Sequence, residues 1–176
     1  MISLDCALTT QRLRLEPMTH ALAAIAANGR AALAEALDAD ISPEWAPGGL
    51  RLLAHMRRGG WAAAAPARAI VVHRSDERVI GDVRFEPAPL RPAVFELGYS
   101  IIPAYRRHGY ASEASARILA WLFGEAGAES VIAGCDMRNR ASVRTLRRLG
   151  FWLDGASGRR AFWWELSRAA FQAQRG

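Results

Sequence analysis

The residues best suited to chemistry lie between Glu96 and Ala114, where a predicted strand runs through a tight turn directly into a predicted helix. The turn contains Arg106, Arg107 and Gly109. The first N–H groups of a helix have no partner inside it, and the helix dipole and both arginines add positive charge at the same place. The stretch therefore favours a site where backbone amides hold a pyrophosphate, with Gly109 allowing close approach, although such segments are also common as plain structure.

The predicted elements that position this turn alternate strands and helices in one α/β domain spanning residues 1–176. Alternating or β-branched runs predict seven strands, and amphipathic or alanine-rich runs predict the helices. The strands are expected at 11–16, 68–74, 78–85, 94–102, 131–133, 151–153 and 161–166, and the helices at 19–39 (two, broken at Asn28-Gly29), 50–58, 111–125 and 139–149. Short turns between the strands from 68 to 102 favour antiparallel neighbours, so we expect a mixed, mostly antiparallel sheet flanked by helices.

Composition bounds the class of protein. The chain has 176 residues, is 51% hydrophobic and 23% charged, and carries a net charge of +6, values that exclude a disordered or fibrous chain. All 23 basic residues are arginine, which favours a coding bias over a functional explanation, although the positive charge would also attract anionic partners.

Cysteine usage and apolar runs indicate the compartment. Cys6 and Cys135 are far apart, with no spacing for a disulfide framework or a metal site, and we expect both as small core residues. The first residues lack a signal-peptide pattern, and the longest apolar runs are too short to span a bilayer. We therefore expect a cytoplasmic protein without a metal site or a membrane partner.

Two motifs resemble those of a known family. The run Arg106-Arg107-His108-Gly109-Tyr110-Ala111 matches the Arg/Gln-x-x-Gly-x-Gly/Ala signature of the GNAT superfamily of acetyl-CoA-dependent N-acetyltransferases. Asn139-Arg140-Ala141-Ser142, followed by Leu149-Gly150-Phe151, resembles the second motif of its RimJ/RimL-like branch, which acetylates protein N-terminal amines. Thr10–Leu15 and the strand around Gly81 resemble the same branch, so the similarity covers most of the chain.

The resemblance implies a GNAT-like fold and a set of residues that hold acetyl-CoA. Backbone amides would bind the pyrophosphate beside Arg106, backbone groups of the preceding strand would pair with the pantetheine arm, and an asparagine would reach that arm or cap its helix. The implied cofactor residues are Ile101, Ile102, Arg106, Arg107, His108, Gly109, Tyr110, Ala111, Ser112 and Asn139. A homodimer is also implied, because dimers are frequent in this superfamily.

Direct acyl transfer to a primary amine needs a base, a polarised carbonyl and a proton for the departing sulfur. Glu96 is the candidate base, directly or through water, and its alternative role is an ion pair with Arg84. We expect Gly98 to form a bulge that frees strand amides. Ser142 is the candidate proton donor, or a small residue packed on the sheet. Many relatives carry a tyrosine acid where this sequence has Leu146.

The acceptor half of the site has weaker motifs. Trp45, in a proline-rich loop, matches a position where the RimJ/RimL-like branch places an aromatic near the acceptor, and its alternative is a buried loop anchor. The acceptor could be a protein N-terminal amine or a small-molecule amine. Two other functions remain open: an acyl-CoA sensor without turnover, and a nucleic-acid-binding domain. The latter would use the arginines of the 139–149 helix, namely Arg140, Arg144, Arg147 and Arg148, which otherwise form a solvated face.

Overall fold

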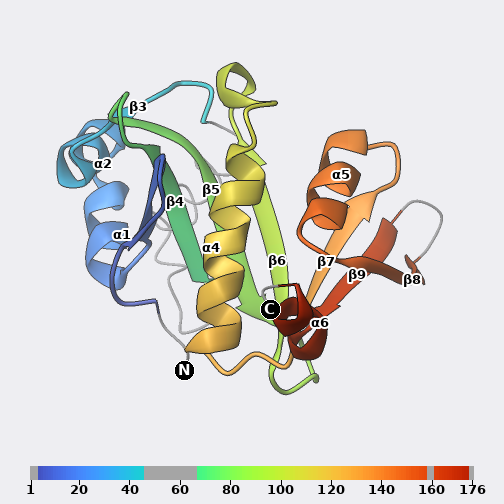
Figure 1. Cartoon of the computed structure of the whole chain (residues 1–176). Coiled ribbons are helices and arrows are strands. Elements are labelled where there is room, and N and C mark those ends of the chain that lie inside the picture. The colour runs from blue at the N-terminus through green and yellow to red at the C-terminus, as the bar shows by residue number, and fades with distance from the viewer. Residues whose placement is uncertain (1–3, 46–66, 158–160, 175–176) are drawn as a thin grey trace.

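The computed structural model describes residues 4–45, 67–157 and 161–174, and within them a single mixed sheet organises the chain (Figure 1). Its strands follow the order β1-β2-β4-β5-β6-β7-β9-β8, and β3 lies beside β5. The strands are β1 (Leu8–Thr9), β2 (Leu13–Pro17), β3 (Asp40–Ile41), β4 (Ala67–His73), β5 (Arg78–Pro87), β6 (Val94–Ile101), β7 (Ser130–Asp136), β8 (Trp152–Ser157) and β9 (Ala161–Ser167). The helices are α1 (His20–Ala27), α2 (Arg30–Leu37), the 3-10 turn η1 (Pro103–Tyr105), α4 (Tyr110–Gly124), α5 (Arg140–Arg148) and α6 (Arg168–Ala173).

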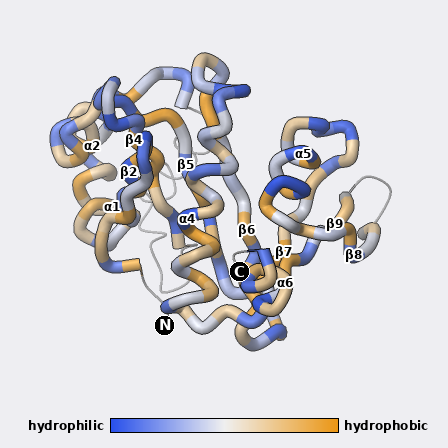
Figure 2. The backbone as a smooth tube through the Cα atoms, viewed as in Figure 1, coloured by the Kyte–Doolittle hydropathy of each residue, from blue (hydrophilic) through white to orange (hydrophobic). Residues whose placement is uncertain are grey.

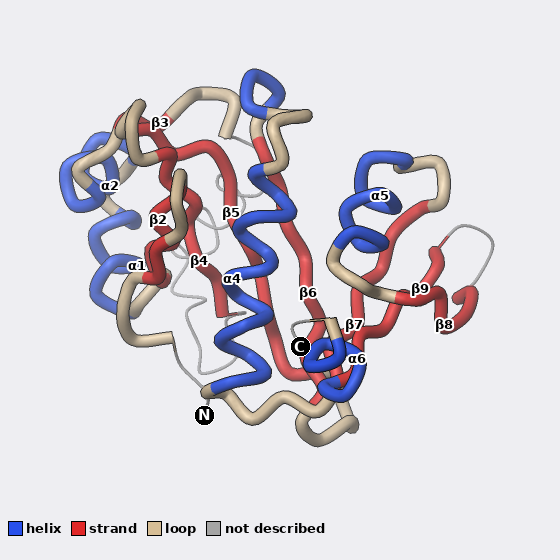
Figure 3. The backbone as a smooth tube through the Cα atoms, in the orientation of Figure 1, coloured by secondary structure: helices blue, strands red, loops and turns tan. Residues whose placement is uncertain are grey.

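The predicted α/β class and the mostly antiparallel sheet are confirmed, and Figure 3 shows the helices flanking the sheet. The sheet has nine strands because β1 and β3, each two residues long, show no periodicity that sequence could reveal. The short helix α6 was also missed, since the preceding strand pattern runs directly into its cap at Ser167. The helix predicted at 50–58 lies outside the described residues.

The core forms where the amphipathic helix α4 packs against the central strands. Its buried residues include Ala114, Ile118 and Leu122, as predicted, and Trp121 packs edge-on against Phe85 of β5 with ring centroids 5.4 Å apart. Figure 2 shows hydrophobic residues along α4, whereas α5 carries strongly hydrophilic residues between its hydrophobic ones. The burial of one face holds α4, and therefore its first turn, in a fixed position relative to β6.

Val143, Leu146 and Leu149 are buried, as the predicted amphipathic pattern of α5 requires. Cys6 corrects another expectation: it is exposed, in the segment before the first strand, whereas Cys135 is partly buried.

The parallel contact between β6 and β7 covers only Val94–Glu96 against Ser130–Ile132. Beyond these residues the two strands diverge, as Figure 1 shows. On its other side β6 pairs with β5 in unbroken register from Gly81↔Ile101 to Pro87↔Phe95. The bulge predicted at Gly98 is therefore wrong: divergence from β7, rather than an extra residue against β5, leaves the strand edge open.

Gly81 tests how closely β5 and β6 approach. A Cβ at this position would lie 2.0 Å from the backbone oxygen of Ser100, which cannot move without breaking the strand pair. We expect Gly81→Ala to lower the free energy of unfolding by about 3 kcal/mol or more, the upper end of measured overpacking costs. Urea denaturation monitored by circular dichroism measures this loss.

Gly124→Ala is the matched control, since a Cβ there meets nothing within 4 Å and alanine favours the end of α4. An equal loss of stability in both variants would contradict the close approach of the strands.

Candidate active site

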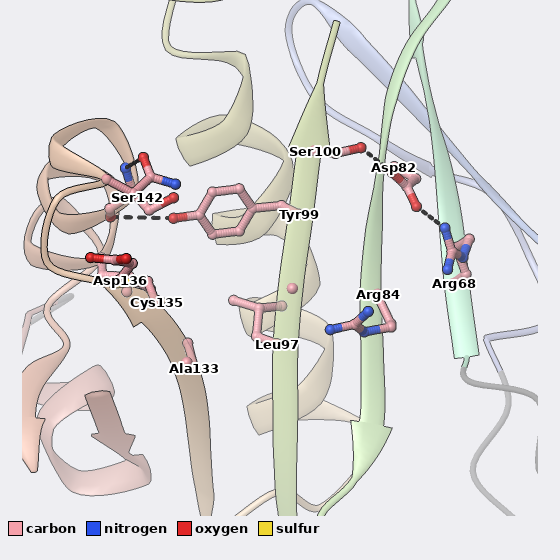
Figure 4. Close-up of a pocket in the computed structure, with 14 residues that line it drawn as sticks. Arg68, Asp82, Arg84, Leu97, Tyr99, Ser100, Ala133, Cys135, Asp136 and Ser142 are labelled. Atoms are coloured by element: carbon pink, nitrogen blue, oxygen red, sulfur yellow. Dashed lines mark hydrogen bonds and ion pairs between the residues drawn. The ribbon is translucent and has the colours of Figure 1, made fainter. Parts of the chain in front are cut away.

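Two cavities open where β6 and β7 diverge, and they share one wall. The large groove, about 840 Å³, runs along the turn before α4 and along α5. The small cavity, about 440 Å³, crosses β6 toward β5 and β4 (Figure 4). Both are lined by Tyr99, Ser100, Asn139 and Ser142. These four residues form the junction at which anything held in the groove meets anything held in the small cavity.

The predicted turn leads directly into a helix, and the first amides of that helix have no partner within it. Gly109 is the N-cap of α4, with φ of 85° and no side-chain cap, and the first helical bond runs from the Glu113 N–H to the Gly109 carbonyl. The N–H groups from Gly109 to Ser112 precede that bond and have no partner within the helix. Arg107 also has positive φ, 67°. The left-handed backbone conformation at position 109 favours glycine. Crowding is not the reason, because a Cβ there would meet only Arg12, at an ordinary contact distance of 3.6 Å.

Two aromatic side chains of the turn point to different sides. Tyr110 lines the groove but is buried, and its hydroxyl lies 2.9 Å from Nε2 of His73. His108 is exposed and stacks on Tyr110, as expected for a solvent-facing residue. Below them, the Tyr105 hydroxyl donates to Asp76 at 2.6 Å, and this bond lowers the pKa of Asp76 and raises that of Tyr105. These contacts fix the shape of the turn.

The first turn of α4 is attached to the N-terminal segment through Glu113. Its carboxylate accepts hydrogen bonds from the Thr10 hydroxyl at 2.6 Å and from Arg12 Nε at 2.7 Å. Burial alone would raise the pKa of Glu113, but the bonds from Thr10 and Arg12 outweigh it and lower the pKa. The guanidinium of Arg12 also lies over the Tyr110 ring, 4.4 Å from its centroid.

The large groove is positively charged on both sides. Arg106 and Arg107 line it from the turn, and Arg144 and Arg148 line it from α5. The last two correct the expectation of a purely solvated face, because the divergence of β7 carries α5 to the opposite wall of the groove. The groove lining does not include Arg140, and Arg147 instead lies over the Trp164 ring at 5.7 Å.

The backbone of β6 offers hydrogen-bonding groups on the side where β7 has left. The Ile102 N–H donates to Ile80 at 2.8 Å, and its carbonyl accepts from Tyr105. Because antiparallel pairs alternate, the backbone groups of Ile101 and Tyr99 point the other way, toward the groove. Ile101 is thus placed as predicted, with its carbonyl accepting from Arg106 Nε at 2.9 Å. Ile102 does not face the groove as predicted, because its N–H and carbonyl are bonded to Ile80 and Tyr105. Tyr99 offers its backbone groups to the groove instead.

The junction joins the start of α5 to β6. The Ser142 N–H donates to Asn139 Oδ1 at 3.1 Å, so Asn139 caps α5, as expected for its structural role. The Tyr99 hydroxyl donates to the Ser142 carbonyl at 3.3 Å. Burial raises the pKa of Tyr99 despite this bond, which keeps the phenol protonated. Sequence analysis missed Tyr99 because nothing in a strand pattern shows that its ring crosses to another helix.

Two other predicted residues lie away from the junction. Glu96 lines neither described cavity, and its carboxylate is 3.8 Å from Nη2 of Arg84, the ion pair expected as its alternative role. Trp45 is buried in the core and lines neither cavity, which matches its alternative role as a loop anchor. The carboxylates that line the small cavity are Asp82 and Asp136.

Cys135 also lines the small cavity, and burial raises the pKa of its thiol, which disfavours a nucleophilic thiolate. Within residues 4–45, 67–157 and 161–174, no three His, Cys, Asp or Glu side chains are grouped as metal ligands. In the same ranges, no helix is both long and apolar enough to cross a membrane.

Comparison with known proteins agrees with this geometry. Residues 12–152 match the family described as "Acetyltransferase (GNAT) domain". Two Bacillus subtilis N-acetyltransferases, YjdG and YoaA, are 28% and 31% identical over 94 and 85 residues, or 53% and 48% of this chain and 56% and 48% of theirs. The alignments thus span about half the length of these relatives.

Solved structures share the fold. The GNAT-family acetyltransferase from Bacillus anthracis superimposes with a TM-score of 0.66 at 17% identity, covering 93% of this chain and 99% of that one. Ribosomal-protein-S5-alanine acetyltransferase from Vibrio fischeri gives 0.63 at 18% identity, covering 93% and 97%. The chain belongs to the GNAT acetyltransferase family.

The bonds of Glu113 predict a pH dependence of stability. Its pKa is lowered in the folded state, so its contribution is present at neutral pH and is lost as the pH falls through that lowered value. We expect Glu113→Gln to cost about 1–2 kcal/mol at neutral pH and to lose part of that deficit in acid. Thermal unfolding of both proteins between neutral and acid pH measures this.

Glu129→Gln is the control, because Glu129 is largely exposed and pairs with Arg168 at 3.2 Å, away from the turn. A Glu113→Gln deficit that stayed constant with pH would contradict the assignment.

Proposed function

We propose that this protein transfers the acetyl group of acetyl-CoA to a primary amine, either a protein N-terminal amine or a small-molecule amine. The observation that carries the proposal is the junction: a basic groove with free helix amides meets a second cavity at Tyr99, Asn139 and Ser142. A cofactor and an acceptor bound in the two cavities would meet there, as direct transfer in a ternary complex requires.

The groove residues fit coenzyme A. The amides from Gly109 to Ser112 and the four arginines would hold its phosphates. The outward backbone groups of Tyr99 and Ile101 would pair with the pantetheine arm as an added strand pairs with a sheet edge. Acetyl-CoA supplies a thioester as the acyl donor.

Two residues at the junction are proposed as proton donors to the departing sulfur. Ser142 is the donor suggested by the motif, and Tyr99 is the donor suggested by geometry, since its hydroxyl reaches Ser142 from β6. A tyrosine whose pKa is raised remains an acid at neutral pH and so is suited to donate. Tyr99 would then supply the acid that Leu146 cannot.

Deprotonation of the amine is assigned to a carboxylate. Glu96 is held by Arg84 beside the small cavity, so a proton would reach it through water. Asp136 lines the cavity directly and is the second candidate. An α-amino group needs only a weak base, because about a tenth or more of it is neutral near pH 7.

Placement in the RimJ/RimL-like branch rests on the motif around Asn139 and on the likeness in fold to the Vibrio fischeri enzyme. Two free cysteines, Cys6 and Cys135, support a cytoplasmic location. The proposed homodimer rests on the family alone.

Thiol release from acetyl-CoA, measured against a panel of amines and N-terminal peptides, tests the function. Release that depends on the amine supports the proposal. Coenzyme A binding with no release from any acceptor would replace it with the sensor function, and absence of coenzyme A binding would overturn both.

The two groove arginines of α5 generate a prediction. We expect the double variant Arg144→Gln/Arg148→Gln to raise KM for acetyl-CoA about tenfold, because two charge-assisted phosphate contacts are lost, with little change in kcat. Steady-state kinetics with acetyl-CoA as the varied substrate measures this. Arg140→Gln is the control, because it removes a charge from the same helix outside the groove. An equal rise in KM for acetyl-CoA in this variant would show that net charge alone causes the change.

The proton donor can be identified at the junction. We expect Tyr99→Phe to lower kcat about a hundredfold with unchanged KM for acetyl-CoA, because the acid is removed while the ring still fills its place. Ser142→Ala should lower kcat by less if serine only relays the proton. Variants within twofold of the parent protein would leave water as the donor and remove both assignments.

A further inference from the structure

Two arginines face each other on the wall of the small cavity opposite the junction. Arg68 of β4 and Arg84 of β5 are direct register partners, so their side chains leave the sheet on the same face, and both line the cavity (Figure 4). Like charges directly opposite one another destabilise a strand pair. Asp82, Glu86 and Glu96 each pair with one of the two arginines and offset part of that cost, and an anion between the guanidinium groups would offset more of it.

Arg68 is only partly satisfied by its protein partner. Its side chain is 10% exposed and forms an ion pair with Asp82, which also accepts a hydrogen bond from the Ser100 hydroxyl. Its Nε is buried and has no hydrogen-bond partner. The ion pair with Asp82 uses Nη1, so the guanidinium keeps a second terminal nitrogen for a ligand in the cavity that Arg68 lines.

Arg84 shows the same deficit from the neighbouring strand. It lies over Gly98, where a Cβ would come within 2.9 Å of Nη2, so the glycine opens the path of the guanidinium across β6. Its carboxylate partners are distant, 3.4 Å for Glu86 and 3.8 Å for Glu96, compared with about 2.8 Å for a charge-assisted hydrogen bond. Its buried Nε forms this 3.4 Å ion pair with Glu86 without the geometry of a hydrogen bond.

The charges that line the small cavity are arranged by sign. Arg68 and Arg84 stand on the β4 and β5 side, while Asp136 stands on the β7 side, near Ser142. Asp82 balances Arg68. The lining is therefore neutral in sum but has a positive end and a negative end, which suits a ligand with a carboxylate at one end and an amine at the other.

We propose that the acceptor is a free amino acid, whose carboxylate binds between Arg68 and Arg84 while its amine points toward Tyr99 and Asp136. This deepens the proposed function and rests on it. A cavity of about 440 Å³ is of the size that small molecules occupy. Two carboxylate oxygens can accept from the guanidinium groups of both arginines, which line the cavity.

The experiment compares free amino acids with their carboxamides, which keep the amine but lose the negative charge. Binding to the full chain saturated with coenzyme A is measured by calorimetry, and thiol release from acetyl-CoA is measured in parallel. We expect the best amino acid to bind about ten- to a hundredfold more tightly than its amide, as expected for a charge-assisted bidentate contact.

Arg84→Gln should abolish that preference while leaving affinity for coenzyme A unchanged. Arg84 is chosen because its side chain is 41% exposed, whereas loss of the buried Arg68 would leave Asp82 unpaired and threaten the fold. Arg78→Gln is the matched control: it lies on the same strand, pairs with Asp40 and does not line the cavity.

The outcomes separate the two proposals. Equal binding of acid and amide, or a preference that survives Arg84→Gln, would overturn the carboxylate site even if other amines release thiol. A preference for the acid that Arg84→Gln removes would support the site, even if no acceptor released thiol and acetyl transfer itself failed.

Discussion

The short parallel contact between β6 and β7 is the constraint on which the rest of the site depends. Three register pairs join the strands, and then they separate. Separation leaves backbone groups of Tyr99 and Ile101 without a neighbouring strand and opens a groove between α5 and the turn before α4. Both cavities follow from this one departure from regular pairing, because a continued ladder would have closed the sheet and satisfied the same groups internally.

An open edge is useful only if the groups around it stay in place. The turn before α4 is held from below by Tyr105, Asp76 and His73, and the helix itself by Glu113. These polar contacts are made by side chains, so they do not use the backbone amides at the start of α4. Two arginines of the site are held in the same manner, Arg106 through Nε by the Ile101 carbonyl and Arg68 through Nη1 by Asp82.

The positions of the arginines in this protein say more than its net charge does. A net charge of +6 suggests a general attraction for anions, but the arginines with a defined place fall into two groups. Those of the large groove suit phosphates, and those of the small cavity face carboxylates that neutralise them in part. In the proposed function, the first group would draw in a polyanion through charge, while the second, neutral in sum, would select by geometry.

Local sequence determined the main elements and the anion turn, because periodicity, glycine at the start of α4 and the Asn139 cap act within a few residues of the chain. It also indicated the family through the two motifs. Only the tertiary structure decided which residues meet: that Tyr99 reaches Ser142, that Ile102 is occupied by β5, that Arg144 and Arg148 face the groove, and that Arg68 lies beside Arg84. Such contacts join strands and helices far apart in sequence, and they depend on where β7 leaves β6, a choice made by packing across the whole sheet that no local pattern encodes.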